Sequence, residues 1–404
     1  MSCREIPTPP PVAPTSMREP APMIMPDYHG GSIVNLMASI VQALEAEDRL
    51  YPPLRALPPA RLTSRNIVLL VIDGLGHDSL ITHCRDGVLA RHMKDRITSV
   101  FPATTATAIT TFLTGTAPQQ HGVTGWFTYF RELGAVLAVL PYQPRHGGPV
   151  PTVPARMLFD HVPVFDRLEA RSHVVAPNRI AHSEFNTAHI GRARPHAFAS
   201  LGQMFKTIAQ IVRARGERNY IYAYWPDLDR LAHEHGIASR EAVAHLAEID
   251  AAFGNFLAGI GGTSTTVIVT SDHGFIDARP DQTIELDAHP QFAATLSLPL
   301  CGERRAAYCY VHASQHAQFV EYVAAHLEKY ADLKDSEYLI ESGYFGLGPP
   351  HARLHERIGD YTLIMKDRSV IKDWLPGEPR YVHIGVHGGM CAQEMYVPLI
   401  VVEA

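Results

Sequence analysis

Four short runs of apolar residues constrain the fold of this chain more than any other feature of its sequence. The runs are NIVLLVI at Asn66–Ile72, NYIYAYW at Asn219–Trp225, TTVIVT at Thr265–Thr270 and YTLIM at Tyr361–Met365. Strands with so few polar positions are typical of a mainly parallel sheet that is covered on both faces. Helical spacing of apolar residues occurs at 32–47, 200–215 and 239–258. This alternation predicts an α/β fold in which a mainly parallel central sheet has helices on both faces.

The remaining segments suggest how the 404 residues are organised. Residues 1–30 are rich in proline, which predicts an extended N-terminal arm. The alternation of strands and helices breaks at about 125–199, which is loop-rich and aromatic, and at about 289–358, which has the pattern of mixed strands and a helix. We interpret both stretches as insertions into one large domain that spans 31–404.

The composition argues against several other classes of protein. With 35 basic and 41 acidic residues the formal charge is −6, which disfavours binding to nucleic-acid polymers. The longest aliphatic run, 67–72, is far shorter than the roughly 18 residues of a membrane span. The five cysteines are scattered without a CxxC pair, and the N-terminus lacks the apolar core of a signal peptide, so we expect a cytoplasmic protein without a disulfide framework.

Metal-capable side chains follow two of the predicted central strands. Asp73 comes directly after the first strand, and Asp272 and His273 follow the third in the sequence SDHG. The carboxyl ends of parallel strands form the edge at which open α/β sheets bind ligands. A dinucleotide-binding turn is the weaker interpretation of VIDGLG, because Ser79 occupies the third glycine position and Asp73 would repel a pyrophosphate. Taken alone, however, Asp73 could simply begin a turn.

Three further segments carry groups of the same kind. In WPDLDRLAHEHG, Asp229 and His233 are spaced i, i+4, which places both on one face of a helix. His387 lies in the glycine-flanked turn VHGG. In FPATTATA, Thr105 follows a proline and is expected near a helix N-terminus, where free backbone N–H groups attract an anion. Individually, these residues could be surface charges or a helix cap.

Together the segments predict a metal centre. Three carboxylates, three imidazoles and one hydroxyl are the oxygen and nitrogen ligands that suit two divalent metal ions, Zn²⁺ first and Mn²⁺ as the alternative. Two such ions would balance the charges of three aspartates and one threonine alkoxide. Without the ions, the converging carboxylates would repel one another.

The order of these motifs resembles the type I phosphodiesterase/nucleotide pyrophosphatase branch of the alkaline phosphatase superfamily. The matching pieces are VIDGLG, FPATTATAITTFLTG, PDLDRLAHEHG, TSDHG and VHGG, spread over about 66–391. The resemblance implies an alkaline-phosphatase-like catalytic domain with two metal sites and a threonine nucleophile, and the carried-over residues fall into two sets. One set is Asp229, His233 and His387, and the other is Asp73, Asp272, His273 and the nucleophile Thr105.

One position departs from the family pattern. Enzymes of the nucleotide pyrophosphatase group carry an asparagine three residues after the nucleophile, and the corresponding residue is Ala108. If the nucleophile were Thr104, the alignment would shift by one residue. The departure weakens the expectation of a nucleotide substrate, and it leaves the expectation of a two-metal hydrolase intact.

The predicted activity is hydrolysis of a small-molecule phosphate ester through a phosphothreonine intermediate. Phosphomonoesterase and phosphonate hydrolase are alternatives on the same site, and a metal-retaining protein without turnover is the alternative from another class. Sulfatase activity is disfavoured because the segment lacks the cysteine or serine and arginine that formylglycine formation needs. Residues that could line the substrate pocket, with core packing as the alternative, are Trp126, Phe127, Tyr129, His182, His189, Tyr224 and Trp225.

Overall fold

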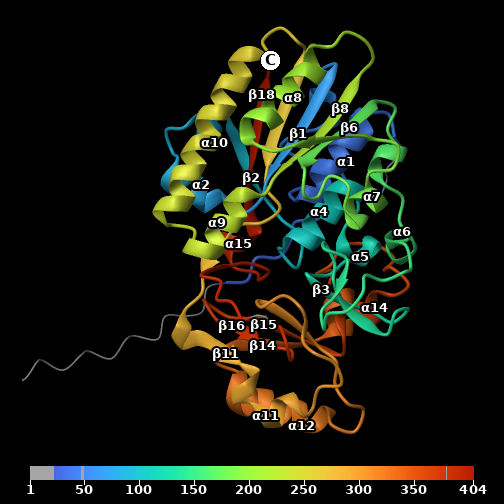
Figure 1. The fold of residues 1–404 in the computed structure, drawn as a ribbon, viewed down its shortest axis with the longest axis vertical. Coiled ribbons are helices and arrows are strands. Elements are labelled where there is room, and N and C mark those ends of the chain that lie inside the picture. Colours follow the sequence, from blue (N-terminus) through green and yellow to red (C-terminus); the bar gives the residue numbers. More distant parts are fainter. Residues whose placement is uncertain (1–21, 47–49, 379) are drawn as a thin grey trace, which may run out of the picture.

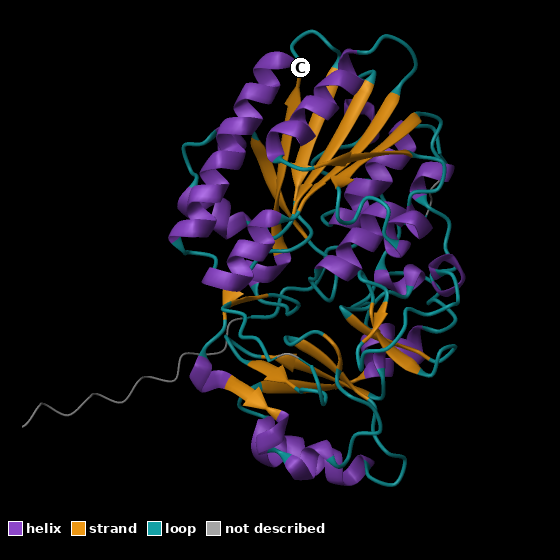
Figure 2. Cartoon of the chain, viewed as in Figure 1, coloured by secondary structure: helices purple, strands orange, loops and turns teal. Residues whose placement is uncertain are grey.

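The computed structural model describes residues 22–46, 50–378 and 380–404, and its centre is a seven-stranded sheet between two layers of helices (Figure 1, Figure 2). The strand order is β2-β18-β9-β1-β8-β6-β7. All neighbours from β9 to β7 pair in parallel, whereas β18 is antiparallel to both β9 and β2. The predicted mainly parallel α/β fold is therefore confirmed. The strands are β1 (Asn66–Ile72), β2 (Met93–Thr98), β6 (Arg171–Pro177), β7 (Arg194–Phe198), β8 (Asn219–Trp225), β9 (Thr265–Thr270) and β18 (Tyr396–Glu403).

The central strand β1 is buried along its whole length because helices cover both of its faces. Alternate residues of a strand point to opposite faces, and those of β1 divide between two hydrophobic cores. The core around Ile67 contains α1 and α4, and the core around Val68 contains α8 and α10. The helix bounds are Ile33–Ala43 for α1, Thr105–Thr114 for α4, Leu201–Arg213 for α8 and Arg240–Gly259 for α10.

A second seven-stranded sheet lies below the central one in Figure 1, and every neighbouring pair in it is antiparallel. It unites strands from both of the stretches expected as insertions. Its order is β14-β15-β13-β12-β3-β4-β5. The bounds are β3 (Phe127–Phe130), β4 (Ala135–Ala138), β5 (Gln143–Pro144), β12 (Cys301–Gly302), β13 (Ala306–Cys309), β14 (Ala331–Asp335) and β15 (Tyr361–Met365).

Two expectations about these strands need correction. β15 was expected to join the central sheet, and it lies in the second sheet, where separate cores bury Leu363 and Ile364. An apolar run indicates burial on both faces and does not identify the sheet. Conversely, β6 and β7 fall within 125–199 and belong to the central sheet, so only the part of that stretch before Arg171 departs from the alternating pattern.

Two further pairs of short strands form separate two-stranded sheets. β10 (Ile276–Asp277) pairs with β17 (Gly385–Val386), and β11 (Thr283–Glu285) pairs with β16 (Val370–Lys372). The remaining helices are α2 (His77–His83), α3 (Val88–Arg91), α5 (Pro118–His121), α6 (Ala155–Leu158), α7 (Glu184–His189), α9 (Asp227–His235), α11 (Pro290–Ala293), α12 (His316–Tyr322), α13 (Ser336–Glu341), α14 (Leu354–Ile358) and α15 (Ala392–Met395).

The described end of the predicted N-terminal arm lies against the domain. The backbone N–H of Ile24 donates to the carbonyl of Met390, and the Tyr28 hydroxyl donates to the carbonyl of Tyr344. The rest of the predicted arm, 1–21, lies outside the described residues. None of the helices in the described ranges combines the length and the apolar character that crossing a bilayer requires.

Candidate metal centre and active site

The predicted site residues meet because three neighbouring strands end at the same level of the central sheet. β1 pairs with β8 and with β9, so that Ile72 lies opposite Trp225 and Val71 lies opposite Thr270. Asp73 therefore leaves the sheet beside the SDHG turn that follows β9 and beside the start of α9, which follows β8. The parallel register brings three segments that are far apart in the sequence to one edge.

One cluster at this edge contains Asp229, His233 and His387. The Nε2 atom of His233 lies 3.3 Å from Oδ1 of Asp229 and 3.2 Å from Nε2 of His387. The Nε2 atom of His387 lies 3.7 Å from the same aspartate oxygen. The i, i+4 spacing on α9 has the predicted effect, since it turns both side chains toward the HGG turn.

A second cluster surrounds His273. Its Nε2 atom lies 3.3 Å from Oδ1 of Asp73, 3.4 Å from Oδ2 of Asp272 and 3.1 Å from Oγ1 of Thr105. The two clusters adjoin, because this nitrogen is also 3.9 Å from Oδ1 of Asp229 and the His273 ring stacks on His387 at 3.6 Å between centroids. All seven predicted site residues are thus brought together.

The three imidazoles are held through the same nitrogen, Nδ1, so that Nε2 of each ring faces the clusters. In each ring Nδ1 donates to a backbone carbonyl, at 2.9 Å from Gly385 for His233, at 3.1 Å from Gly274 for His273 and at 3.3 Å from Ala103 for His387. A hydrogen bond from Nδ1–H selects the tautomer whose Nε2 carries a lone pair, which is the usual arrangement in metal-binding histidines. The backbone therefore presents three nitrogen ligands to the space between the clusters.

Two of the three carboxylates, Asp73 and Asp272, are also oriented by hydrogen bonds on one side only. Asp272 accepts the N–H groups of Gly74 and His273 on Oδ1, and Asp73 accepts the hydroxyl of Tyr224 on Oδ2. The facing oxygens, Oδ1 of Asp73, Oδ1 of Asp229 and Oδ2 of Asp272, are buried without a hydrogen-bond partner in the described structure. Buried carboxylate oxygens without partners are costly unless a cation binds them. The donor set therefore fits divalent metal ions.

The pKa directions reflect the same crowding. Burial, and then the charge of Asp229, raise the pKa of Asp73 well above its usual value. Burial, and then the charge of Asp73, do the same to the pKa of Asp272. Burial alone would also raise the pKa of Asp229, but the adjacent His233 lowers it overall. Positive charge between the clusters would stabilise all three carboxylates.

The geometry separates Thr105 from its neighbour Thr104. Thr105 is the first residue of α4 and faces His273, whereas the hydroxyl of Thr104 donates to Oε1 of Glu303 at 2.7 Å. Oε1 of Glu303 also accepts the backbone N–H of Trp126 at 2.7 Å. Thr105 therefore has the hydroxyl directed at the metal-ligand atoms, at the N-terminus of a ten-residue helix whose first N–H groups can receive an anion.

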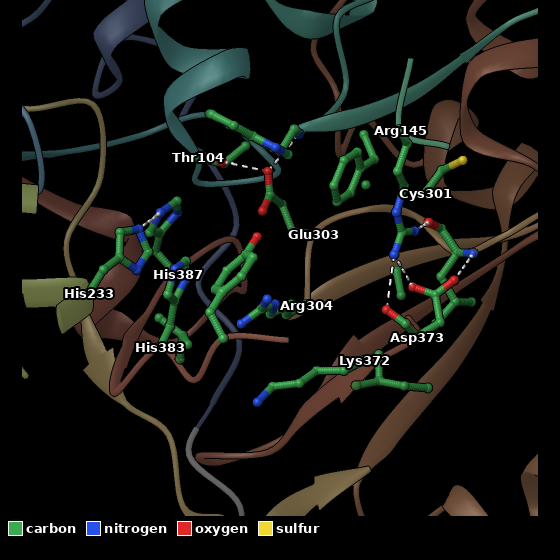
Figure 3. Close-up of a pocket in the computed structure, with 18 of the residues that line it drawn as sticks. Thr104, Arg145, His233, Cys301, Glu303, Arg304, Lys372, Asp373, His383 and His387 are labelled. Atoms are coloured by element: carbon green, nitrogen blue, oxygen red, sulfur yellow. Dashed lines mark hydrogen bonds and ion pairs between the residues drawn. The ribbon is translucent and has the colours of Figure 1, made fainter. Parts of the chain in front are cut away.

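A cavity with a volume of about 220 Å³ adjoins this centre (Figure 3). Thr105, Asp229, His233 and His387 form one side of it. The other walls include residues that the motifs did not identify, among them Glu303, Arg304, Lys372, Trp374, Tyr381 and His383. Their sequence signals were weak, because they lie in the irregular segments around β12, β16 and β17.

The predicted pocket aromatics divide into two groups. Trp126 and Phe127 line the cavity, and Tyr129 lies in a separate open depression. Tyr224 serves the metal centre through its hydrogen bond to Asp73, and Trp225 is a core residue that stacks on Phe198. Of the predicted aromatic residues, Trp126 and Phe127 thus lie in the wall of the cavity, and the other three do not.

The other pocket candidates lie away from this cavity. His182 does not line it, and His189 lies in a buried cluster with Phe185 and His161. Ala108, at the position where the family carries asparagine, is fully buried within α4.

Similar folds occur among solved structures. Murine ectonucleotide pyrophosphatase/phosphodiesterase 5 has a TM-score of 0.62 at 16% identity, with 82% of this chain and 87% of that chain covered. The human protein of the same name has a TM-score of 0.62 at 18% identity, with 83% and 87% covered. Phosphonoacetate hydrolase from Sinorhizobium meliloti 1021 has a TM-score of 0.60 at 15% identity, with 84% and 90% covered. A search among curated proteins finds no match.

The family assignment comes from the sequence itself. A family model described as type I phosphodiesterase/nucleotide pyrophosphatase matches residues 67–390. That range begins in β1 and ends just after the HGG turn, so it includes every residue of the two clusters. This chain therefore belongs to the type I phosphodiesterase/nucleotide pyrophosphatase family and is a phosphoryl hydrolase.

Proposed function

We propose that the protein hydrolyses a small-molecule phosphodiester with two divalent metal ions and Thr105 as the nucleophile. The observation that carries the proposal is the position of the Thr105 hydroxyl, 3.1 Å from Nε2 of His273 where the two ligand clusters meet. Asp229, His233 and His387 would hold one ion, and Asp73, Asp272, His273 and Thr105 would hold the other. The mixed nitrogen and oxygen ligands favour Zn²⁺, with Mn²⁺ as the alternative.

When bound, two divalent ions would lower the pKa of the threonine hydroxyl and balance negative charge on the phosphoryl and leaving oxygens. Thr105 then loses its proton to solvent water, and its Oγ1 forms a bond to phosphorus while the bond to the departing oxygen breaks. The departing oxygen keeps the electron pair and takes up a proton from water to leave as an alcohol. The first N–H groups of α4 hold a phosphoryl oxygen during this step. Water subsequently cleaves the threonine–phosphorus ester and regenerates the hydroxyl.

A phosphonate hydrolase is the second candidate, and Ala108 is the observation that favours it. The alanine side chain cannot supply the amide group with which the asparagine of the nucleotide-cleaving enzymes holds a phosphoryl oxygen. The solved structure of phosphonoacetate hydrolase is also among the similar folds. Both candidates use the same nucleophile, and they differ in the bond that breaks.

The test compares bis-p-nitrophenyl phosphate, p-nitrophenyl thymidine phosphate, p-nitrophenyl phosphate and phosphonoacetate, each with added Zn²⁺ or Mn²⁺ and with a chelator. We expect metal-dependent hydrolysis of a diester, no activity in Thr105→Ala and partial activity in Thr105→Ser. Thr110→Ala is the matched control, because the Thr110 hydroxyl bonds within α4 to the carbonyl of Ala106. Unchanged hydrolysis by Thr105→Ala would refute the covalent mechanism, and release of phosphate from phosphonoacetate alone would favour the second candidate.

A further inference from the structure

Two cations in the cavity, the buried Lys372 and the half-buried Arg304, lack the close carboxylate contacts that charges removed from water normally have. Within the described chain, the guanidinium of Arg304 makes no hydrogen bond or ion pair, and its Nη1 atom is buried. Lys372 is only 7% exposed, and its Nζ approaches a carboxylate oxygen, Oε1 of Glu285, no closer than 4.0 Å. Figure 3 shows both side chains extending into the cavity. Leaving two positive charges in such surroundings is costly without a counter-ion.

Aromatic rings hold Arg304 while leaving its donors available. The guanidinium carbon lies 4.9 Å from the ring centroid of Tyr381 and 5.5 Å from that of Trp374. A guanidinium stacked on aromatic faces keeps its N–H groups at its edge, where they can bind a planar or tetrahedral oxyanion. Trp374 is itself fixed by its indole N–H, which donates to Oε2 of Glu285 at 2.6 Å.

A third cation in the same cavity, Arg145, differs from these two because it forms ion pairs with carboxylates of the protein. Arg145 lies 2.7 Å from Oδ1 of Asp373 and 3.2 Å from Oε2 of Glu378, and it also donates to the carbonyl of Leu300. Because these carboxylates balance its charge, Arg145 stabilises the cavity wall and needs no external anion. Arg304 and Lys372 have no equivalent pair of carboxylates.

The electrostatics of the two side chains agree with this difference. Burial lowers the pKa of Lys372, and the charge of Arg304 lowers it further. Burial also lowers the pKa of Arg304. The charge of Glu303, which faces the same cavity, raises the pKa of Arg304, but the Glu303 carboxylate makes its hydrogen bonds to the Thr104 hydroxyl and the Trp126 N–H and none to the guanidinium. An anion from outside would stabilise the charged form of both side chains.

We propose that Arg304 and Lys372 bind a second acidic group of the substrate, a carboxylate or a phosphate, while its phosphoryl group lies at Thr105. One cavity contains all three residues, so a single small molecule can contact both ends. The inference rests on the proposed function, and it adds the substrate class: a phosphate ester or phosphonate that carries another acid on its organic part.

The experiment measures dissociation constants by calorimetry on the full chain loaded with Mn²⁺. The probes are alkylphosphonates, ω-carboxyalkylphosphonates and alkane bisphosphonates of matched chain length, which share one phosphonate and differ at the other end. The proteins are wild type, Arg304→Met, Lys372→Met and the control Arg96→Met. Arg96 also stacks on an aromatic ring, that of Tyr396 at 4.2 Å, but it does not line this cavity.

We expect wild type and Arg96→Met to bind an acid-tailed probe at least about tenfold more tightly than the alkyl probe of the same length, because charge-assisted hydrogen bonds are worth that much. In Arg304→Met and Lys372→Met the ratio should fall toward one. Whichever of the two acidic tails, carboxylate or phosphonate, gives the lower dissociation constant identifies the second acidic group of the substrate. Equal binding of acid-tailed and alkyl probes by wild type overturns the inference, and so does a preference that survives in both variants.

The design separates this inference from the proposed function. The wild-type comparison needs no variant, so a variant that fails to fold does not remove the test. Hydrolysis of bis-p-nitrophenyl phosphate, measured in parallel, reports the proposed function alone. A protein that hydrolyses this diester without preferring acid-tailed probes would contradict only the substrate class, whereas selective binding without any hydrolysis would contradict only the reaction.

Discussion

Replacing Asp272 by asparagine should stabilise the metal-free protein, although it removes a proposed metal ligand. One ligand oxygen of Asp272 lies within 4.8 Å of one of Asp73. Two unit charges no farther apart than that repel by at least about 3.5 kcal/mol at an effective dielectric constant of about 20. Asparagine keeps Oδ1 as the acceptor for the N–H groups of Gly74 and His273, and it places an amide donor toward Asp73. The free energy of unfolding should therefore rise by about 3 kcal/mol.

The stabilising effect of the substitution should diminish when metal is bound. In the loaded protein the same substitution removes a charged ligand, so the variant should gain less stability from Mn²⁺ than wild type does. The assay is urea unfolding followed by circular dichroism at about pH 8, where the carboxylates of the unfolded chain are ionised, once with a chelator and once with saturating Mn²⁺. Asp86→Asn, which changes an exposed aspartate, is the control and should leave both midpoints unchanged.

A metal-free Asp272→Asn protein that is equally stable or less stable than wild type would refute this reasoning. That result would mean that the clustered carboxylates do not repel one another in the folded state. The donor set would then be a satisfied polar network, and the argument for bound cations from the unpartnered oxygens would fail with it.

Three further predictions follow from contacts around the centre. Tyr224→Phe removes the hydroxyl that orients Asp73, so we expect Mn²⁺ to bind about 10–100-fold more weakly. The affinity is measured by competition with a metal indicator, and an unchanged affinity would show that the hydroxyl does not orient Asp73 for the metal. Glu394→Gln leaves the buried Arg305 guanidinium without its charge partner and should cost about 3–5 kcal/mol in urea unfolding, whereas replacing both residues by leucine should cost less. Burial lowers the pKa of His189 to about 4, so this residue binds more protons in the unfolded chain below about pH 6.5. It should contribute about 3 kcal/mol to the loss of stability between pH 6.5 and pH 4, and His189→Phe should reduce the loss by that amount in urea unfolding.

The central strands could be predicted because each of them is a continuous run of mostly apolar residues, which indicates burial on both faces. β1, β8 and β9 begin and end where the apolar runs do. β7 could not be found in this way, because it lies at the edge of the sheet and most of its residues are exposed. The placement of β15 depends on antiparallel pairing with β13 and β14, which are distant in the sequence. Local pattern therefore predicts which residues are buried and leaves their partners undetermined.

The same distinction applies to the site. Asp73, Asp272 and His273 follow strands directly, and Asp229 and His233 share one helical turn, so short-range rules were sufficient to find them. The cavity wall depends on long-range pairings, such as Glu285 opposite Lys372 between β11 and β16. Arg304 is adjacent in sequence to other charged residues, and nothing local distinguishes a cation that faces a cavity from one that faces solvent.

The segment between β12 and β13 connects the cavity wall to the metal centre. Arg304 faces the cavity, whereas the adjacent Arg305 points away from it and forms a buried ion pair with Glu394 at 2.8 Å. Glu394 also accepts the N–H of Gly389, in the turn that carries His387. One short segment thus positions a proposed metal ligand, His387, and exposes Arg304, the cation proposed to bind substrate. Changes at Arg304 should alter the choice of substrate, whereas changes at Arg305 should disturb the metal ligands themselves.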